Sequence, residues 1–217
     1  MRVGLGIYRV AGPDLTSIYD DNAYLVLSNK CHILIDSGSG YAIDVMIRNM
    51  LYLIEDLKEI KYMILTHAHH RNFGGAYYMR EIIPSLTIVA HHIDGAYIRN
   101  PDKKYCQVIE NLGEPKPVPI SLEIHEKFKR LSLCGEEIEI IHIPIHTRGS
   151  IGAFLRRGGL EYGFVGGLIE DMLNRELSSE EKDYLKKSLD VKKIDVLCHS
   201  RGCIYGYDKI AGLLYNY

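Results

Sequence analysis

The chain has 217 residues, of which 47% are hydrophobic and 25% charged, and its formal net charge at pH 7 is −2. This composition is typical of a globular protein with a well-filled core, and the length fits one domain covering residues 1–217. No run of lysines or arginines is present, so we expect no binding to long nucleic acids or to membranes.

The first residues are too short and too interrupted for a signal peptide, and no apolar stretch is long enough to cross a bilayer, so we expect a cytoplasmic protein. The odd number of cysteines, without a Cys-x-x-Cys pair, predicts neither a disulfide framework nor a thiolate zinc site. The composition has one glutamine, Gln107, and many Ile, Glu, Lys and Tyr residues. This balance leans towards a thermophilic source.

The five cysteines are Cys31, Cys106, Cys134, Cys198 and Cys203.

In the first half of the chain, apolar runs alternate with turn signals. They predict strands at residues 3–10, 21–28, 32–35, 61–65 and 86–90. Apolar positions at helical spacing predict a helix over 41–57 that packs on a sheet, and a second helix over 76–83. His91 and His92, which follow the last of these strands, are predicted to be structural or surface residues.

Between the strand at 61–65 and the next helix lies the most unusual stretch, Thr66-His67-Ala68-His69-His70-Arg71-Asn72-Phe73-Gly74-Gly75. In a bend after a strand, His67 and His69 can both turn towards one point while Ala68 points away. Two imidazole ligands of a metal ion need this arrangement. We therefore expect the chemistry of the protein here.

The second half begins with a segment punctuated by proline and glycine, residues 100–119, which we expect to cross the surface; a flap over a site is the alternative. Strands are then predicted at 128–133, 137–143, 153–155, 162–165 and 194–197. Ser178 and Glu181 form a capping-box start for a helix. His142 is predicted to be structural. A second motif, Pro144-Ile145-His146-Thr147-Arg148-Gly149-Ser150-Ile151-Gly152, follows the strand at 137–143.

The two motifs resemble the metallo-β-lactamase superfamily signatures Thr-His-x-His-x-Asp-His-x-Gly-Gly and Pro-x-His-Thr-Pro-Gly-Ser-x-Gly. The resemblance implies an α/β fold, the four-layer αββα sandwich, with its site at one edge between two sheets. It also implies that His67, His69 and His146 bind the first metal ion, and that His199 matches the last ligand of a second. Asp36 would support the metal loop from below, with helix capping as a compatible role, and we place Asn72 in the same supporting set.

The chain departs from the family at three positions. Arg71 and Asn72 stand where the family has Asp and His, and Gly167 stands where it has the Asp that bridges both metals. Three neutral imidazoles and a water still make a competent tetrahedral centre, so we expect one zinc ion, with iron or no metal as alternatives.

Three arginines, Arg71, Arg148 and Arg201, each lie two residues after a retained histidine. If their loops converge, the guanidinium groups would surround the place of the missing second metal and bind a small anionic substrate. The alternative is that they are solvated loop residues.

Three functions are compatible with these patterns. The first is a one-metal hydrolase of a small ester, thioester, lactone or phosphoester. The second is a catalytically inactive member that binds an anionic ligand or a protein partner. The third is a mononuclear iron oxygenase, which ranks last because Gly167 removes the carboxylate of its two-His, one-carboxylate triad. The oligomeric state is left open.

Overall fold

The computed structural model describes residues 1–189 and 193–215, which form two β-sheets and their flanking helices. The first sheet has seven strands in chain order: β1 (Arg2–Gly4), β2 (Ile7–Ala11), β3 (Ala23–Leu27), β4 (His32–Ile35), β5 (Ile60–Ile64), β6 (Thr87–His91) and β7 (Leu122–Ile124). The strands from β1 to β4 pair antiparallel, and those from β4 to β7 pair parallel.

The second sheet has six strands in the order β13-β12-β11-β10-β9-β8. Its strands are β8 (Phe128–Leu133), β9 (Glu136–His142), β10 (Ile151–Arg157), β11 (Leu160–Phe164), β12 (Val196–His199) and β13 (Gly202–Tyr205). All neighbours pair antiparallel except β11 and β12. The helices are α1 (Ile43–Leu51), α2 (His70–Phe73), α3 (Ala76–Ile82), α4 (His92–Arg99), α5 (Leu168–Asn174), α6 (Ser179–Leu189) and α7 (Tyr207–Tyr215), with short 3-10 helices at Leu57–Glu59 and Glu110–Leu112.

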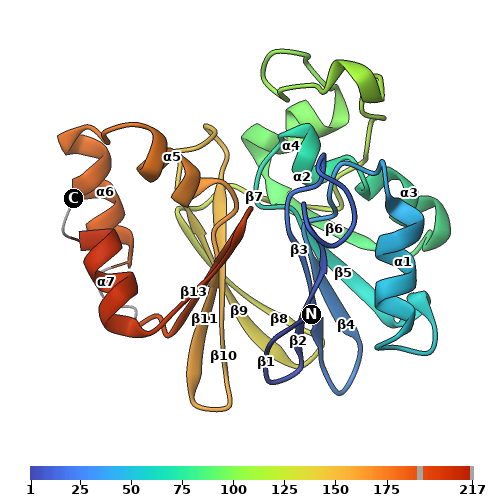
Figure 1. Ribbon diagram of the computed structural model, residues 1–217, viewed down its shortest axis with the longest axis horizontal. Coiled ribbons are helices and arrows are strands. Elements are labelled where there is room, and N and C mark those ends of the chain that lie inside the picture. Colours follow the sequence, from blue (N-terminus) through green and yellow to red (C-terminus); the bar gives the residue numbers. More distant parts are fainter. Residues whose placement is uncertain (190–192, 216–217) are drawn as a thin grey trace.

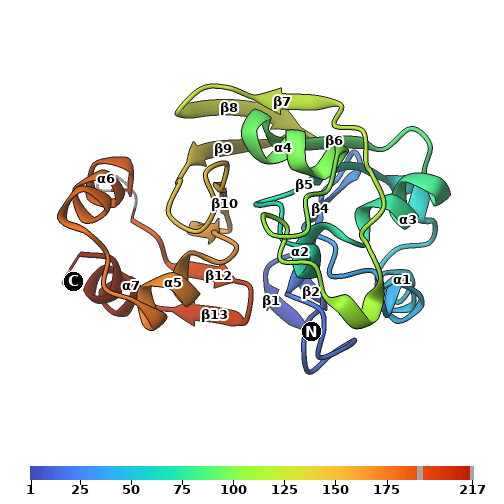
Figure 2. The same cartoon turned by 90° about the horizontal axis from the view of Figure 1, so that it is seen from above.

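The two sheets face each other, with α1 and α3 outside the first and α6 and α7 outside the second (Figure 1; Figure 2 gives the view from above). The predicted four-layer αββα sandwich is therefore confirmed.

Three apolar clusters separate the four layers, because successive side chains of a strand point to opposite faces. In β6, Val89 packs between the sheets, whereas Ile88 packs against the helices of the first sheet. In β12, Cys198 faces the first sheet and Leu197 faces the helices of the second. Burial on both faces explains why these strands read as nearly continuous apolar runs.

Several predicted bounds differ from the structure. The strand expected at 3–10 is a hairpin of β1 and β2, turned at Gly6 with a φ of 65°. The helix expected over 41–57 ends at Leu51, which is exposed and not part of the core. Asp56 then starts a separate 3-10 turn through its own capping box with Glu59. The sequence patterns missed β13 and α7 altogether.

The prediction that no disulfide framework exists is wrong. Cys31 pairs with Cys134 across 103 residues, and Cys198 pairs with Cys203 across the β12–β13 hairpin. Cys106 is free and buried. Spacing along the chain gave no signal, because the first pair is brought together only when the two sheets pack.

A search of the described residues finds no helix with the length and apolar character needed to cross a bilayer.

Candidate metal centre

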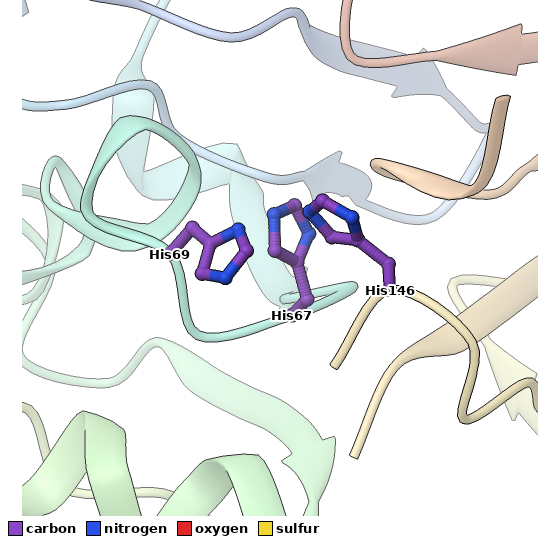
Figure 3. Close-up of side chains that lie close together, drawn as sticks. All are labelled: His67, His69 and His146. Carbon is purple, nitrogen blue, oxygen red and sulfur yellow. The ribbon is translucent and has the colours of Figure 1, made fainter. Parts of the chain in front are cut away.

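Three histidines from two loops converge at one edge of the sandwich, between the sheets. The chain leaves β5 at Ile64, and His67 and His69 project from the bend before α2 begins at His70. His146 comes from the loop between β9 and β10, in the second sheet. Figure 3 shows the three rings turned towards one another, and their centroids lie 4.5 to 4.8 Å apart.

The three rings fit a single metal ion. One nitrogen from each lies within 4.8 Å of the others, and no other group of this kind occurs in the described part of the chain. Imidazole nitrogens are the donors that tetrahedral zinc sites use. Among the described residues, Nε2 of His67 is buried and has no hydrogen-bond partner, which a metal would supply.

Burial keeps the imidazoles of His67 and His69 neutral, which is the form that binds metals. Burial, helped by His146, lowers the pKa of His69 to about 3, and burial also lowers the pKa of His67 well below its usual value. Nδ1 of His67 lies 3.1 Å from the Thr66 hydroxyl. That hydroxyl donates to Asp36, so its oxygen can accept the Nδ1 proton of His67 and leave Nε2 as the ligand atom.

Asp36 lies beneath the histidine loop and holds it in place. One carboxylate oxygen accepts the Thr66 N–H at 2.7 Å and the Asn72 side-chain amide at 2.7 Å. The same amide lies 3.3 Å from the His67 carbonyl. Burial raises the pKa of Asp36 to about 7, against the opposing effect of the Thr66 and Asn72 hydrogen bonds. Asp36 and Asn72 therefore act on the geometry of the histidine loop.

His146 is fixed by α5, the helix that follows the family's missing bridging carboxylate. Its Nδ1 lies 2.6 Å from an Asp171 carboxylate oxygen. Its ring covers Gly167, where an added Cβ would lie 2.2 Å from Nε2. An aspartate at position 167 therefore has no room while His146 keeps this position.

Asp94 ties the two histidine loops together, a role that the sequence patterns did not reveal. Its carboxylate accepts the Ala68 N–H at 2.8 Å, the Thr147 hydroxyl at 2.6 Å and the Gly149 N–H at 2.9 Å. The Tyr105 hydroxyl also donates to it, at 2.6 Å. In the sequence, Asp94 looks like an ordinary residue of a first helical turn.

A cavity of about 600 Å³ opens on the histidine cluster, and we call it the metal cavity. His69 and His146 line it together with Arg71 and Arg201. Arg148 does not line it and instead borders a smaller cavity of about 250 Å³ on the other side of the same two histidines. Two of the three predicted arginines are thus brought together.

Charged and polar side chains that line the metal cavity pair with one another. His199 lies outside the ligand cluster and pairs through Nδ1 with Glu170 at 2.9 Å. Arg201 lies 3.1 Å from Asp21, a buried carboxylate whose pKa burial raises to about 6, while Arg201 acts in the opposite direction. One Glu170 oxygen, Oε2, is buried and has no hydrogen-bond partner in the part of the chain that the structure describes.

The segment 100–119 packs behind the histidine loop. The Cys106 carbonyl accepts the His70 N–H at 2.7 Å, and Gln107 lines the metal cavity. Gln107 has a φ of 47°, an uncommon value for a residue other than glycine. The segment is thus part of the cavity wall, which goes beyond the surface crossing expected from the sequence.

A second histidine cluster lies outside the metal cavity. His91 stacks on His142 at 4.0 Å, and His92 stacks on His125 at 4.5 Å. Nε2 of His142 lies 2.9 Å from the Arg148 carbonyl, within the loop that carries His146. Parallel stacking directs the nitrogen lone pairs along parallel planes, so these rings are not arranged around a common ion. They are structural, as expected.

Another cavity, of about 730 Å³, is lined by charged groups of both signs, including Arg130, Glu137 and Lys193. None of the clustered histidines borders it, so the metal cavity is the candidate site.

The chain belongs to the metallo-beta-lactamase superfamily, whose family model matches residues 19–197. Among solved structures, it is similar to BJP-1, a subclass B3 metallo-beta-lactamase of Bradyrhizobium japonicum, with a TM-score of 0.71 and 20% identity over 90% of this chain and 74% of that one. A metallo-beta-lactamase of Cronobacter sakazakii gives a TM-score of 0.70 and 18% identity over 90% of this chain and 74% of that one. These likenesses concern the fold.

A curated relative is ribonuclease J2 of Bacillus subtilis (strain 168), 29% identical over 90 residues. That match covers 39% of this chain and only 16% of the relative.

Proposed function

We propose that the protein is a hydrolase that uses one metal ion, held by His67, His69 and His146, on a small anionic ester, thioester, lactone or phosphoester. The observation that carries the proposal is the convergence of three imidazoles, one with a buried nitrogen that has no hydrogen-bond partner among the described residues, at the wall of a cavity of substrate size. Zinc is the metal we favour, and in such a site it lowers the pKa of a bound water to about 7.

The neighbouring residues would divide the remaining work. Asp171 fixes the ring plane and tautomer of His146. Glu170 is held by His199 through one oxygen and lines the metal cavity, where its carboxylate would accept a hydrogen bond from the attacking water. Arg71 donates a hydrogen bond from one guanidinium nitrogen to the Ile18 carbonyl. Its remaining N–H groups would bind an anionic group of the substrate. Arg201 is partly neutralised by Asp21, so Arg71 is the stronger candidate.

Two observations favour a single metal. Gly167 lies under the His146 ring and offers no ligand atom. The other candidate ligands are engaged in pairs, Glu170 with His199 and Asp21 with Arg201. The iron oxygenase alternative lacks support, since no carboxylate belongs to the ligand cluster found among the described residues.

The first test is metal stoichiometry by elemental mass spectrometry on protein purified without added metal. We expect about one zinc per chain, lost in His146→Ala and kept in His125→Ala, which removes a histidine remote from the cluster. Wild-type protein that stays empty after zinc is offered would refute the metal site.

The second test measures hydrolysis by the zinc-loaded protein. Substrates should cover ester, thioester, lactone and phosphodiester bonds, the last because of the short match to a ribonuclease, and a β-lactam because of the structural neighbours. Activity that disappears in Glu170→Gln, with zinc retained, would support the assigned role. A zinc-loaded protein inactive on every bond class would favour the alternative of a ligand-binding member without catalysis.

A further inference from the structure

A second, apolar cavity adjoins the metal cavity, and we call it the apolar groove. It has a volume of about 530 Å³ and is lined mainly by Ile169 and Leu173 of α5, Ile204 of β13 and Leu213 of α7. The Leu173 side chain is exposed, at 65% of its full area. An exposed leucine at the mouth of an apolar cavity marks a place where another apolar group can be buried.

The two cavities share part of their walls. Leu173 and His199 line both of them. Polar groups gather on the metal side of this boundary, with Arg71, Glu170 and Asp171, and apolar side chains gather on the other. A ligand that extends from the metal cavity past Leu173 therefore meets a charged environment at one end and an apolar one at the other.

We propose that the substrate is amphipathic: an anionic ester or thioester whose reacting end lies in the metal cavity and whose alkyl or acyl chain lies in the apolar groove. This inference rests on the proposed function and names the substrate class. Small binding sites combine a few polar groups with a mainly apolar wall, and here the two parts are divided between neighbouring cavities. Lys209 also lines the groove and is exposed, so its methylenes can contribute to the wall while its ammonium group stays in solvent.

The proposal predicts a chain-length effect on binding. Burial of one methylene contributes about 0.8 kcal/mol, which corresponds to an affinity gain of about fourfold. Because the groove is partly open, we expect a gain of two- to fourfold per methylene until the groove is filled. The probes are unbranched alkyl carboxylates from butanoate to dodecanoate, kept below their micelle-forming concentrations, and the measurement is isothermal titration calorimetry on the zinc-loaded protein.

The decisive variant is Leu173→Glu, which places a charge at the boundary without removing a buried side chain. Leu51→Glu is the matched control, because Leu51 is also an exposed leucine in the last turn of a helix but lies on α1. We expect the chain-length gain to vanish in Leu173→Glu and to persist in Leu51→Glu.

Two results would overturn the proposal. One is equal affinity for short and long carboxylates in the wild type. The other is an unchanged gain per methylene in Leu173→Glu. If the series is flat and light scattering finds a dimer that dissociates in Leu173→Glu, the groove is a self-association surface instead.

The same measurements distinguish failure of the groove assignment from failure of the proposed hydrolase function. A flat series in a protein that holds one zinc and hydrolyses short esters removes only the groove assignment. A chain-length gain in a protein that binds no metal removes only the hydrolase.

Discussion

At the scale of single residues, the absence of a side chain at Gly167 shapes the site as much as its charged groups do. Gly167 has a φ of −83°, which any residue can adopt, so its backbone does not require glycine. The His146 ring requires it, because that ring lies where a side chain at position 167 would begin. A glycine at position 167 and the present position of the His146 ring therefore depend on each other.

This geometry predicts that Gly167→Ala damages metal binding more than folding. The new Cβ would lie 2.2 Å from Nε2 of His146 and must displace the ring. We expect zinc affinity to fall by roughly 10- to 100-fold, the range found when ligand orientation is disturbed. Competition with a chromophoric chelator measures this change.

Gly202→Ala provides the control, since its Cβ would meet the His199 ring at an ordinary 3.6 Å. Equal zinc affinities for the two variants would contradict the argument.

Sequence patterns predicted the three clustered histidines because two motifs placed them on loops after strands. They could not reveal Asp94 or Gln107. Both reach the site only because segments far apart in the chain pack together. Asp94 accepts a hydrogen bond from Thr147, and Gln107 lines the metal cavity. Such contacts are set by packing and leave no local pattern.

At the scale of elements, the two histidine loops belong to different sheets and need a common anchor. Asp94, at the start of α4, provides it through four hydrogen bonds to the loop after β5, the loop after β9 and Tyr105. The carboxylate is buried, so a donor that loses it as an acceptor cannot form a hydrogen bond to water instead.

We therefore expect Asp94→Asn to lower both stability and metal affinity. An amide keeps the shape but turns an NH2 group towards N–H and O–H donors that now lack an acceptor. Hydrogen bonds to charged groups contribute about 1.5–3 kcal/mol, so the free energy of unfolding should fall by about 3 kcal/mol in urea titrations.

Asp44→Asn, an exposed carboxylate on α1, should leave stability within about 0.5 kcal/mol of the wild type. If the two variants were equally stable, Asp94 would not be the anchor.

Strands were predictable as elements because they are buried on both faces and read as apolar runs. The hairpin and helix at the end of the chain were not, since β13 is only partly buried and α7 lies after the last motif. The early end of α1 was missed for another reason. Ile54 and Leu57 continue its apolar spacing, yet they reach the same core from a loop and a 3-10 turn.

At the scale of the whole molecule, acid should weaken the sandwich through the histidine stack between the sheets. His91 of β6 is buried, and burial, with His142, His92 and His125 nearby, lowers its pKa to about 3. The pKa of His142 is lowered as well, by burial first, with the carbonyl of Arg148 and the charge of Asp94 opposing and Lys127 assisting.

The folded state therefore binds protons less readily than the unfolded chain, whose histidines have pKa values near 6.5. The stability contributed by neutral His91 is complete above about pH 6.5 and declines as the pH falls towards 3. His91→Asn removes this group, and its side chain can still accept the Ile93 N–H at the start of α4. We expect the variant to lose less stability than the wild type between pH 7 and pH 5 in urea titrations. Equal losses would show that the stack does not titrate.

The disulfides act on the same scale and differ in the length of chain they close. In the chain-entropy model, a loop of about 100 residues contributes about 4.7 kcal/mol and a loop of six residues about 2 kcal/mol. The double variant Cys31→Ser/Cys134→Ser should therefore lose more stability than Cys198→Ser/Cys203→Ser, by about 2 to 3 kcal/mol. Thermal unfolding without reductant measures the difference, and the opposite ranking would refute this account.

The positions of the Cys31–Cys134 disulfide and the histidine cluster have a joint consequence. Cys31 precedes β4, whereas the histidine loop follows β5, and these strands are parallel, so the two features lie at opposite edges of the sandwich. Each joins the first sheet to the second. A metal ion held by His67, His69 and His146 would link the two sheets at the edge that has no disulfide. At a free metal concentration a thousand times its dissociation constant, binding would add about 4 kcal/mol to the free energy of unfolding. The melting temperature alone would then rank candidate metals before any substrate is known.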